Sequence, residues 1–485
     1  MTYSDLYIIF PVVILTVWAC ALLLVDLFIP KGSKGWTALL AALGLLIVLA
    51  VAIAQSFQVP ASGQKMQGFS GMVTLDGFAS FMQILVVISA LVGIALAYDY
   101  LKRMGLDRGE YYVLLLFTSL GMMLMAQAAD LIVVFLALEL LSIPLYVLSG
   151  FARPRVESEE AALKYFLLGA FSTAFVVYGI ALTYGATGTT SLVGVLSYLR
   201  GNAANEAMLL IGAGLILIGL GFKVAAVPFH MWTPDVYQGA PSTVVAFMAV
   251  GAKLGGFAAL LRVFITAFPA LGVDLTPVIG GLAILTMVLG NFVALTQTNI
   301  KRFLAYSSIS HAGYILIGLV PYWKDGVSSD GVAASLFYLL AYAFNNFAAW
   351  SVVIALEKAE GQGLLLEDYA GLGKKYPGLA AAMAIAMFSF TGVPPTVGFI
   401  GKFYIFRTAI EGGFIGLALV GVFTSVISAY YYLRVVVYMY MRDGEPQARS
   451  ERWLNITTAV TAIGTLIMIV FSEPLFAWVT QAVIR

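Results

Sequence analysis

Cysteine and histidine are almost absent from this sequence of 485 residues. There is one cysteine, Cys20, and there are two histidines, His230 and His311. A disulfide needs two cysteines, and structural zinc and iron–sulfur sites use several cysteine or histidine ligands. The chain therefore cannot build any of these sites from its own residues, and we expect any electron transfer to take place on another chain.

Charged residues are also scarce. They make up 11% of the chain, whereas hydrophobic residues make up 61%; soluble domains carry roughly 25% charged residues. The formal net charge is +1 and no glycine-rich phosphate loop follows a strand-like segment, so nucleic acid is not an expected partner. This composition indicates a polytopic membrane protein surrounded by the lipid bilayer.

Long apolar runs are abundant. A membrane-spanning helix needs about 20 apolar residues. Runs of this kind occupy residues 5–29, 36–56, 76–98, 111–129, 131–151, 160–184, 207–228, 241–265, 276–297, 301–320, 332–356, 379–409, 414–441 and 455–480. We therefore predict an all-α polytopic membrane protein with about fourteen transmembrane helices in a single membrane domain, 1–485. The first run has no basic start, so we expect a retained span and not a cleaved signal.

Basic residues divide unequally between the two sides of these spans. With the N-terminus outside, the cytoplasmic loops carry Lys31, Lys34, Lys102, Arg103, Arg108, Arg153, Arg155, Lys301, Arg302, Lys358, Lys374, Lys375, Arg442, Arg449 and Arg452. Outward positions carry only Lys65, Arg200, Arg262, Lys324, Arg407 and Arg485. Because positively charged loops stay in the cytoplasm, both termini are predicted to lie outside.

Proline interrupts two of the predicted spans. Pro228 ends the seventh span, and Pro394 and Pro395 fall within the twelfth. Proline removes a backbone donor and breaks a helix. The two spans lie five apart, so we predict two inverted five-helix repeats, spans 4–8 and 9–13, with broken helices 7 and 12. The expected organisation is three N-terminal spans in 1–100, a core of repeats in 110–441, and an amphipathic loop with the last span in 442–485.

Several charged side chains lie inside the predicted spans, where burial of a charge is costly. They include Glu139 in the fifth span, Lys223 in the seventh, Lys253 in the eighth and Lys402 in the twelfth. A buried carboxylate without a partner takes up a proton, whereas a nearby ammonium keeps it charged. Movement of Glu139 relative to Lys223 would therefore switch the lysine between holding and releasing a proton, which is the minimum that a pump element needs.

Two further side chains are candidates for the same proton path. Lys164, near the start of the sixth span, is a second possible partner of Glu139, although it could instead extend toward the lipid headgroups. His311 lies in the tenth span among hydroxyl side chains, and we expect this segment to support a hydrated proton chain. The hydroxyl residues are Tyr306, Ser307, Ser308 and Ser310.

Structural alternatives stay open for these residues. An ion pair between Glu139 and Lys223 could simply hold two helices together, and a neutral His311 could do no more than bond a carbonyl. Three other features are expected to have structural roles. These are capping or packing by His230, interfacial anchoring by Arg434, and an aromatic belt or packing surface formed by Tyr430, Tyr431 and Tyr432.

Four segments of the sequence resemble the subunit N family of respiratory complex I, the proton-translocating NADH:quinone oxidoreductase. They are Phe222–Pro241, Gln297–Arg302, Tyr306–Tyr314 and Gly398–Tyr404, and the resemblance covers nearly the whole chain. The motif at Tyr306–Tyr314 is shared with the sister subunits L and M and with multisubunit Na+/H+ antiporters. The block Trp232–Pro241 is typical of the subunit N family, and a lysine at position 402 argues against the subunit M family.

The resemblance implies an antiporter-like fold in which residues 110–441 form the core of inverted repeats. It also implies that Glu139 and Lys223 form a switching pair and that Lys164 modulates this pair. In the same way, Lys253 relays the proton and Lys402 gates its exit. NADH, FMN, iron–sulfur clusters and quinone are implied to bind to partner subunits, so this chain is expected to hold no cofactor.

The combined prediction is a proton-translocating membrane-arm subunit of a bacterial inner-membrane NADH:quinone oxidoreductase. It would form part of a translocase without a redox centre of its own, next to subunits of the M and K types, and would move protons from the cytoplasm to the exterior. Two alternatives stay open. The chain could belong to a multisubunit Na+/H+ antiporter, or it could be a non-conducting structural subunit of the same complex.

Overall fold

The computed structural model describes residues 3–59, 65–201, 205–320, 329–358 and 361–483. Within these ranges the chain is almost entirely helical, apart from a hairpin of two strands, β1 (Met66–Gly68) and β2 (Val73–Leu75). Eleven of the described helices are long and apolar enough to cross a membrane. The predicted all-α polytopic membrane fold is therefore confirmed, whereas the count of fourteen spans stays a prediction. Lys324 and Arg485, used to predict the orientation, lie outside the described residues.

The helices of the N-terminal half are α1 (Tyr3–Ile8), α2 (Phe10–Asp26), η1 (Lys31–Ser33), α3 (Gly35–Ser56), α4 (Gly77–Arg103), α5 (Glu110–Gln127), α6 (Leu131–Ser149), α7 (Val156–Thr187), α8 (Leu192–Gly201), α9 (Glu206–Val224), α10 (Trp232–Gly239) and α11 (Ser242–Thr266). Those of the C-terminal half are η2 (Pro269–Leu271), α12 (Gly272–Ala294), α13 (Ile300–Ile317), α15 (Ser329–Leu356), η3 (Leu366–Tyr369), α16 (Leu372–Lys375), α17 (Pro377–Thr391), α18 (Val397–Glu411), α19 (Ile415–Met441), α20 (Arg452–Val470) and α21 (Ser472–Gln481).

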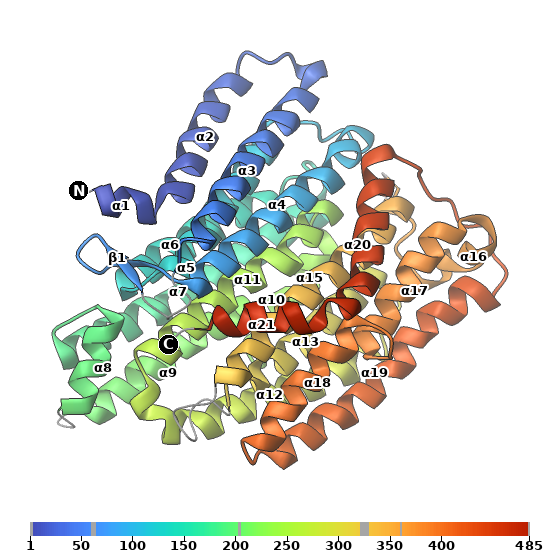
Figure 1. Ribbon diagram of the computed structural model, residues 1–485. Coiled ribbons are helices and arrows are strands. Elements are labelled where there is room, and N and C mark those ends of the chain that lie inside the picture. The colour runs from blue at the N-terminus through green and yellow to red at the C-terminus, as the bar shows by residue number, and fades with distance from the viewer. Residues whose placement is uncertain (1–2, 60–64, 202–204, 321–328, 359–360, 484–485) are drawn as a thin grey trace.

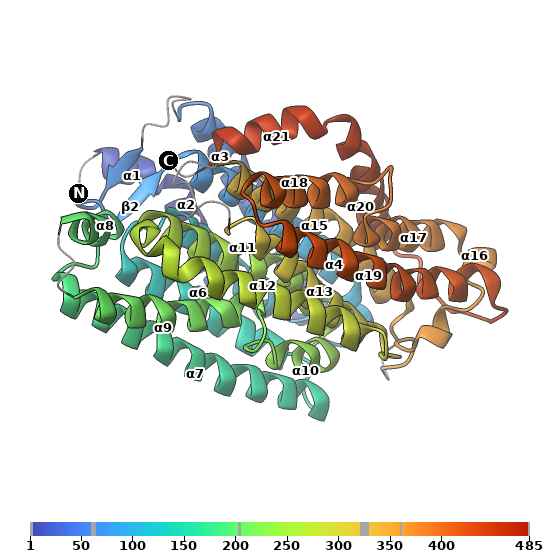
Figure 2. The ribbon, with the colours of Figure 1, turned by 90° about the horizontal axis from the view of Figure 1, so that it is seen from below.

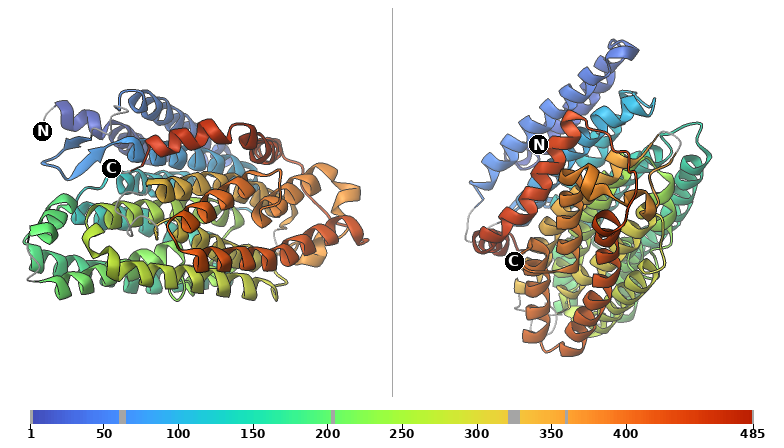
Figure 3. Two further views of the ribbon diagram at one scale, coloured as in Figure 1. Left: turned by 60° about the horizontal axis from the view of Figure 1, so that its bottom comes forward. Right: turned by 90° about the vertical axis from the view of Figure 1, so that its right-hand side faces the viewer.

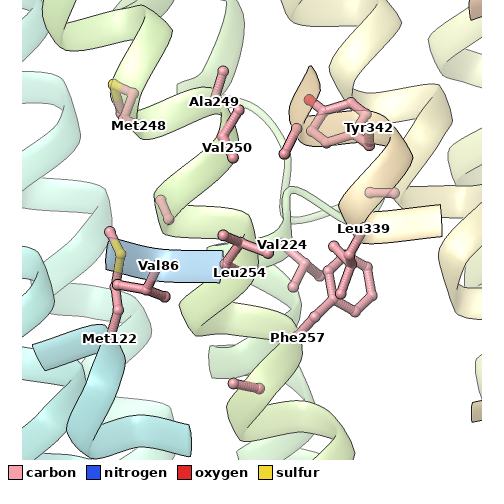
Figure 4. Close-up of a cluster of buried hydrophobic side chains, with 14 of the residues drawn as sticks. Val86, Met122, Val224, Met248, Ala249, Val250, Leu254, Phe257, Leu339 and Tyr342 are labelled. Carbon is pink, nitrogen blue, oxygen red and sulfur yellow. The ribbon is translucent and has the colours of Figure 1, made fainter. Parts of the chain in front are cut away.

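Helix α11 forms the centre of the bundle. It packs against α4, α5, α6 and α9 on one side and against α15 on the other. Its most apolar stretch is completely buried, as expected for a helix that is hydrophobic all round. Figure 4 shows Met248, Leu254 and Phe257 of α11 between Met122 of α5 and Leu339 of α15. The core therefore places any charged side chain of α11 far from both lipid and water.

The long helices run side by side between two ends of the bundle (Figures 2 and 3). Helices α2 and α3 pair at one edge (Figure 1). One end, called here the basic end, carries the loops 104–109, 150–155, 295–299 and 442–451, together with the described residues of 357–376. Ion pairs hold several of its basic residues: Lys34–Asp26 at 2.7 Å, Arg103–Glu451 at 2.7 Å and Lys374–Asp443 at 2.6 Å.

Both proline-containing breaks have the same local form. Helix α9 ends where Ala225 adopts a left-handed conformation, with φ 62°, and α17 ends at Gly392, with φ 86°. A proline follows each of these residues at the third position, Pro228 and Pro395. The breaks lie where proline predicted them, and α18 continues the chain beyond the second break. The inverted repeats themselves stay a prediction, as does the division into 1–100, 110–441 and 442–485.

Two predicted spans are not single helices. The run 5–29 is divided at Ile9 into α1 and α2, and the run 455–480 bends at Phe471 between α20 and α21 (Figure 1). Each new helix has a proline in its first turn, Pro11 in α2 and Pro474 in α21. A proline is tolerated in a first turn, where its missing N–H has no helical partner to lose, but it cannot continue an existing helix.

Candidate functional site

Three lysines from different helices are buried within the bundle. Lys223 at the end of α9 and Lys253 in the middle of α11 are each 2% exposed, and Lys402 in α18 is 4% exposed. Glu139 in α6 is half-buried. The cost of burying these charges has to be offset by polar partners, so their partners define the candidate site.

Lys223 and Glu139 occupy one region of the bundle but are bonded to different partners. The Lys223 ammonium donates to the Tyr146 hydroxyl at 3.3 Å and lies 5.2 Å from the centre of that ring. The Glu139 carboxylate accepts a hydrogen bond of 2.7 Å from the Thr173 hydroxyl. Tyr146 and Glu139 are seven residues apart on α6, so both lie on one face of that helix. Glu139 and Lys223 are not bonded to each other in this structure, and their pairing stays a prediction.

Close packing of α11 on α9 fixes the position of Lys223. A Cβ atom at Gly256 would lie only 2.9 Å from Val224 and 3.2 Å from the Cβ of Lys223. The absence of a side chain at Gly256 therefore lets the two backbones approach at the break. Lys223 is held where α9 ends, next to backbone that is not helical.

Lys253 contacts the hydroxyl-rich helix α13. Its ammonium donates to the backbone carbonyl of Ser308 and lies 5.5 Å from the centre of the Tyr342 ring. The Ser308 hydroxyl accepts a hydrogen bond of 2.8 Å from Tyr342 and lies 3.3 Å from the hydroxyl of Tyr237. Lys253 therefore bonds the backbone of a residue whose side-chain hydroxyl meets hydroxyls from α10 and α15.

His311 is bonded through both ring nitrogens. Nδ1 lies 2.7 Å from the Tyr338 hydroxyl and Nε2 lies 3.0 Å from the Tyr432 hydroxyl. Tyr432 in turn lies 2.5 Å from the Ser307 hydroxyl. A neutral imidazole donates through one nitrogen and accepts through the other, so this arrangement can pass a proton from one tyrosine to the other.

Lys402 in α18 bonds the end of α17 at the second break. Its ammonium donates to the carbonyls of Phe390 and Thr391 at 2.9 and 3.0 Å and to the Ser425 hydroxyl at 3.1 Å. The last carbonyls of a helix lack helical donors and carry partial negative charge. The end of α17 therefore stabilises this ammonium. A cavity of about 660 Å³ between α18 and α19 extends from Lys402 to Arg407 and Glu411.

Lys164 lies apart from this group of buried residues. It is 43% exposed at the basic end, where it pairs with Asp235 at 2.8 Å and with Glu160 at 2.7 Å, and not with Glu139. Asp235 also pairs with Arg302 at 2.8 Å. Partial burial acts to raise the Asp235 pKa, but the bonds from Lys164 and Arg302 outweigh it and the pKa is lowered. Asp235 therefore connects α7 to α13 through the short helix α10.

Replacing Asp235 with asparagine is expected to lower the stability of the complex by no more than about 1 kcal/mol, because both ion pairs are partly exposed. The Asp235 pKa lies below its ordinary value of 3.8 in the folded chain. The pairs therefore contribute fully above that value, and their contribution is lost as the pH falls through the lowered pKa. Thermal unfolding at neutral and acidic pH checks this, since the difference between variant and wild type should shrink on acidification. A difference that grows would contradict it.

Sequence reasoning missed the tyrosines of this site. Only Tyr430 of the run Tyr430–Tyr432 faces outward, at 67% exposed, whereas its two neighbours are completely buried. Tyr432 packs against Phe303 and Phe390, as a packing surface requires, and it also bonds His311, which the sequence did not indicate. Tyr338 and Tyr342 lie four apart on α15, and this spacing puts them on one face. That spacing was visible in the sequence and could have indicated the network.

The other expected structural residues have the following positions. Arg434 donates to the carbonyls of Leu295 and Gln297 at 2.9 and 2.6 Å, so it fastens α19 to the end of α12. His230 follows the first break, where it is partly buried. No group of three or more histidine, cysteine, aspartate or glutamate side chains in the described ranges could hold a metal ion.

A family model, curated relatives and solved structures all match this chain to the same family. A family model described as "NADH:quinone oxidoreductase/Mrp antiporter, TM" matches residues 128–428. NADH-quinone oxidoreductase subunit N of Trichlorobacter lovleyi is 47% identical over 487 residues, which covers 99% of this chain and 97% of the relative.

Solved structures agree with this similarity. A chain of respiratory complex I from Thermus thermophilus with bound aureothin has a TM-score of 0.82 at 35% identity, covering 96% of this chain and 98% of its own. A chain of the Mrp complex from Dietzia sp. has a TM-score of 0.86 at 22% identity, covering 99% and 97%. The second match is a likeness in fold.

Proposed function

This chain belongs to the family of antiporter-like membrane subunits that includes NADH-quinone oxidoreductase subunit N, and on that premise we propose that it conducts protons across a bacterial inner membrane. It acts as a membrane-arm subunit and is driven by quinone reduction in other subunits. The proton moves from the cytoplasm to the exterior. Both termini lie outside, and the basic end faces the cytoplasm.

One observation carries this proposal, namely three buried lysines that each lie beside side chains bearing hydroxyl groups, Tyr146 for Lys223, Tyr342 for Lys253 and Ser425 for Lys402. Lys253 bonds the backbone of Ser308, and that serine's hydroxyl meets two tyrosines. His311 lies three residues further along α13, between two more tyrosine hydroxyls. Such groups can donate and accept in turn. A packing role would not require titratable side chains to be linked in this way.

The lysines have different roles along the path. Lys223 exchanges its proton as Glu139 moves toward or away from it, because the Glu139 carboxylate acts electrostatically on that ammonium. Lys164 modulates this pair from the basic end. Lys253 relays the proton with the help of His311. Lys402 releases it through the cavity that extends toward Arg407 and Glu411.

Redox cofactors belong to partner subunits in this proposal. NADH, FMN, iron–sulfur clusters and quinone are bound elsewhere in the complex, while this chain supplies only the proton path. Its membrane neighbours are subunits of the M and K types. The chemistry available to its own residues is proton binding and proton transfer.

A second candidate function is ion exchange in an Mrp-type antiporter, which has no redox partner. The likeness in fold to the Mrp chain, with a TM-score of 0.86, favours keeping this candidate. Purification of the native assembly separates the two, since an oxidoreductase brings flavin and iron–sulfur subunits with it. A non-conducting spacer is the remaining alternative, and the number of buried lysines argues against it.

The proposal is tested by replacing Glu139 with glutamine, which removes the charge and keeps the size of the side chain. We expect donor-driven proton uptake into inverted membrane vesicles to fall severalfold, because Lys223 loses the carboxylate that controls its charge. The matched control is Glu159→Gln, at an exposed position of α7. Assembly is checked on a native gel. A wild-type ratio of protons to electrons in assembled Glu139→Gln would contradict the proposal.

A further inference from the structure

A buried carboxylate lies at the basic end, outside the path described above. Glu357 directly follows α15 and is 1% exposed. Neither carboxylate oxygen has a partner of good hydrogen-bond geometry among the described residues, and the buried Tyr100 hydroxyl is the neighbour that lies within interaction distance. Its backbone N–H bonds the Val353 carbonyl at 2.9 Å, so it extends the last turn of the helix. Burying a charged carboxylate without hydrogen bonds raises the free energy of the folded chain, and the carboxylate lowers this cost when it takes up a proton.

A second buried titratable group lies near Glu357. Lys301, in the first turn of α13, is 2% exposed and donates to the Ala240 carbonyl at 2.6 Å. A charge on Glu357 acts electrostatically on this ammonium, as does the charge of Arg155. It acts also on two buried tyrosine hydroxyls, from α4 and η3. These are Tyr100 and Tyr369. The carboxylate thus faces titratable groups from several elements.

Cavities at the basic end reach both sides of this pair. One cavity, of about 500 Å³, is lined by Leu356 and Lys358, the two sequence neighbours of Glu357. A second, of about 430 Å³, is lined by Arg302, which follows Lys301. Both have polar residues in their lining and share Asn299. Water from the basic end can therefore come within one residue of each buried group.

The pair is also connected inward to Lys253. Lys301 and Ser308 are seven residues apart on α13, so they lie on one face of the helix and about 10 Å apart along its axis. Ala240, which accepts the bond from Lys301, directly follows α10, and the Tyr237 hydroxyl of α10 lies 3.3 Å from that of Ser308. The Ser308 carbonyl accepts from Lys253. One short helix thus links the two lysines.

We propose that Glu357 and Lys301 form a proton-loading site, which takes protons from the cavities at the basic end and supplies them to Lys253. The inference rests on the proposed function. A proton from water binds a carboxylate oxygen of Glu357 and forms an O–H bond. That O–H bond breaks as the proton passes on toward the hydroxyls of Tyr237 and Ser308, each of which accepts one proton and releases its own, and the carboxylate is restored. Lys301 stabilises the charged form between the two transfers.

The test replaces Glu357 with glutamine in the intact complex. Proton uptake into inverted vesicles is expected to fall at least about tenfold, since a positioned proton-transfer group is lost. The control is Glu206→Gln, an exposed carboxylate in the first turn of α9 that lines neither of these cavities. This control should pump like wild type. Glu357→Asp, which keeps a carboxyl group, should assemble and recover part of the uptake with a changed pH profile.

The outcomes separate this inference from the proposed function. Normal pumping by Glu357→Gln, with loss of pumping in Glu139→Gln, would overturn the loading site and leave the function intact. Normal pumping in both variants would overturn the function itself. Glu357→Asp decides the case in which the glutamine variant fails to assemble. Uptake by the assembled aspartate variant with a changed pH profile supports the loading site, whereas an assembled aspartate variant that keeps the carboxyl group and does not pump overturns it.

Discussion

Replacing Lys223 with alanine is expected to stop proton translocation through this chain and to slow quinone reduction by the assembled complex about tenfold or more. Lys223 is 2% exposed, at the end of α9, and its ammonium contacts Tyr146 beside the region of Glu139. Alanine leaves no titratable group at the break, so the path is interrupted before Lys253. Donor-driven proton uptake and quinone reductase activity in inverted vesicles measure both effects.

Lys223→Arg separates charge from proton transfer in the same experiment. Arginine keeps the positive charge but does not give up a proton in a protein. If Lys223 only held Glu139 in place, arginine would preserve pumping, and if it carries the proton, arginine should be as inactive as alanine. Lys374→Ala is the matched control, because Lys374 pairs with Asp443 at an exposed position. Unchanged pumping in assembled Lys223→Ala would favour the spacer.

Replacing Arg262 with methionine is expected to destabilise the folded subunit by about 3–5 kcal/mol, because it leaves a buried charge without its partner. Arg262 in α11 forms two bonds to Asp76, at 2.5 and 2.8 Å, and is 2% exposed. It also donates to the Ala126 carbonyl at 2.7 Å. The side chain thus fastens the central helix to the start of α4 and the end of α5.

Asp76 provides the second half of this experiment. Burial acts to raise its pKa, but the charge and bonds of Arg262 outweigh burial and lower it. In Arg262→Met the Asp76 pKa should rise above its ordinary value, so the loss of stability should become smaller as the pH falls. Adding Asp76→Asn, which can still cap α4, should recover much of the loss. Thermal unfolding of the complex measures these changes, and an unaltered midpoint in Arg262→Met would contradict the prediction.

The sequence predicted the parts of the site whose placement is energetically costly. A lysine within an apolar run has few explanations, so Lys223, Lys253 and Lys402 were identifiable before their surroundings were known. The same holds for the breaks, because a proline cannot continue a helix. Buried tyrosine is different, since its ring satisfies an apolar environment whether or not the hydroxyl has a function. Tyr432 was therefore assigned to packing.

Residues near the ends of the spans were harder to predict. Lys301 and Glu357 border loops that composition assigns to the water-exposed side, Lys301 after one loop and Glu357 before another, and the tertiary fold buries both. Lys164 has the opposite outcome, because a lysine in the first turns of a long helix can reach the bundle end and pair there with Asp235. The hydropathy of a segment does not determine how deep its first and last turns lie in the bundle. This depth determines whether each of the three side chains is buried or exposed.

The bonds of Lys402 have a mechanical consequence. A charged ammonium has three hydrogens, and this one has three acceptors, the carbonyls of Phe390 and Thr391 and the hydroxyl of Ser425. A neutral amine has two hydrogens, so every departing proton leaves one acceptor without a donor. A buried acceptor without a donor costs about 1–3 kcal/mol. Each proton released therefore raises the free energy of the junction between α17 and α19 by about that amount, until water or the next proton supplies the missing donor.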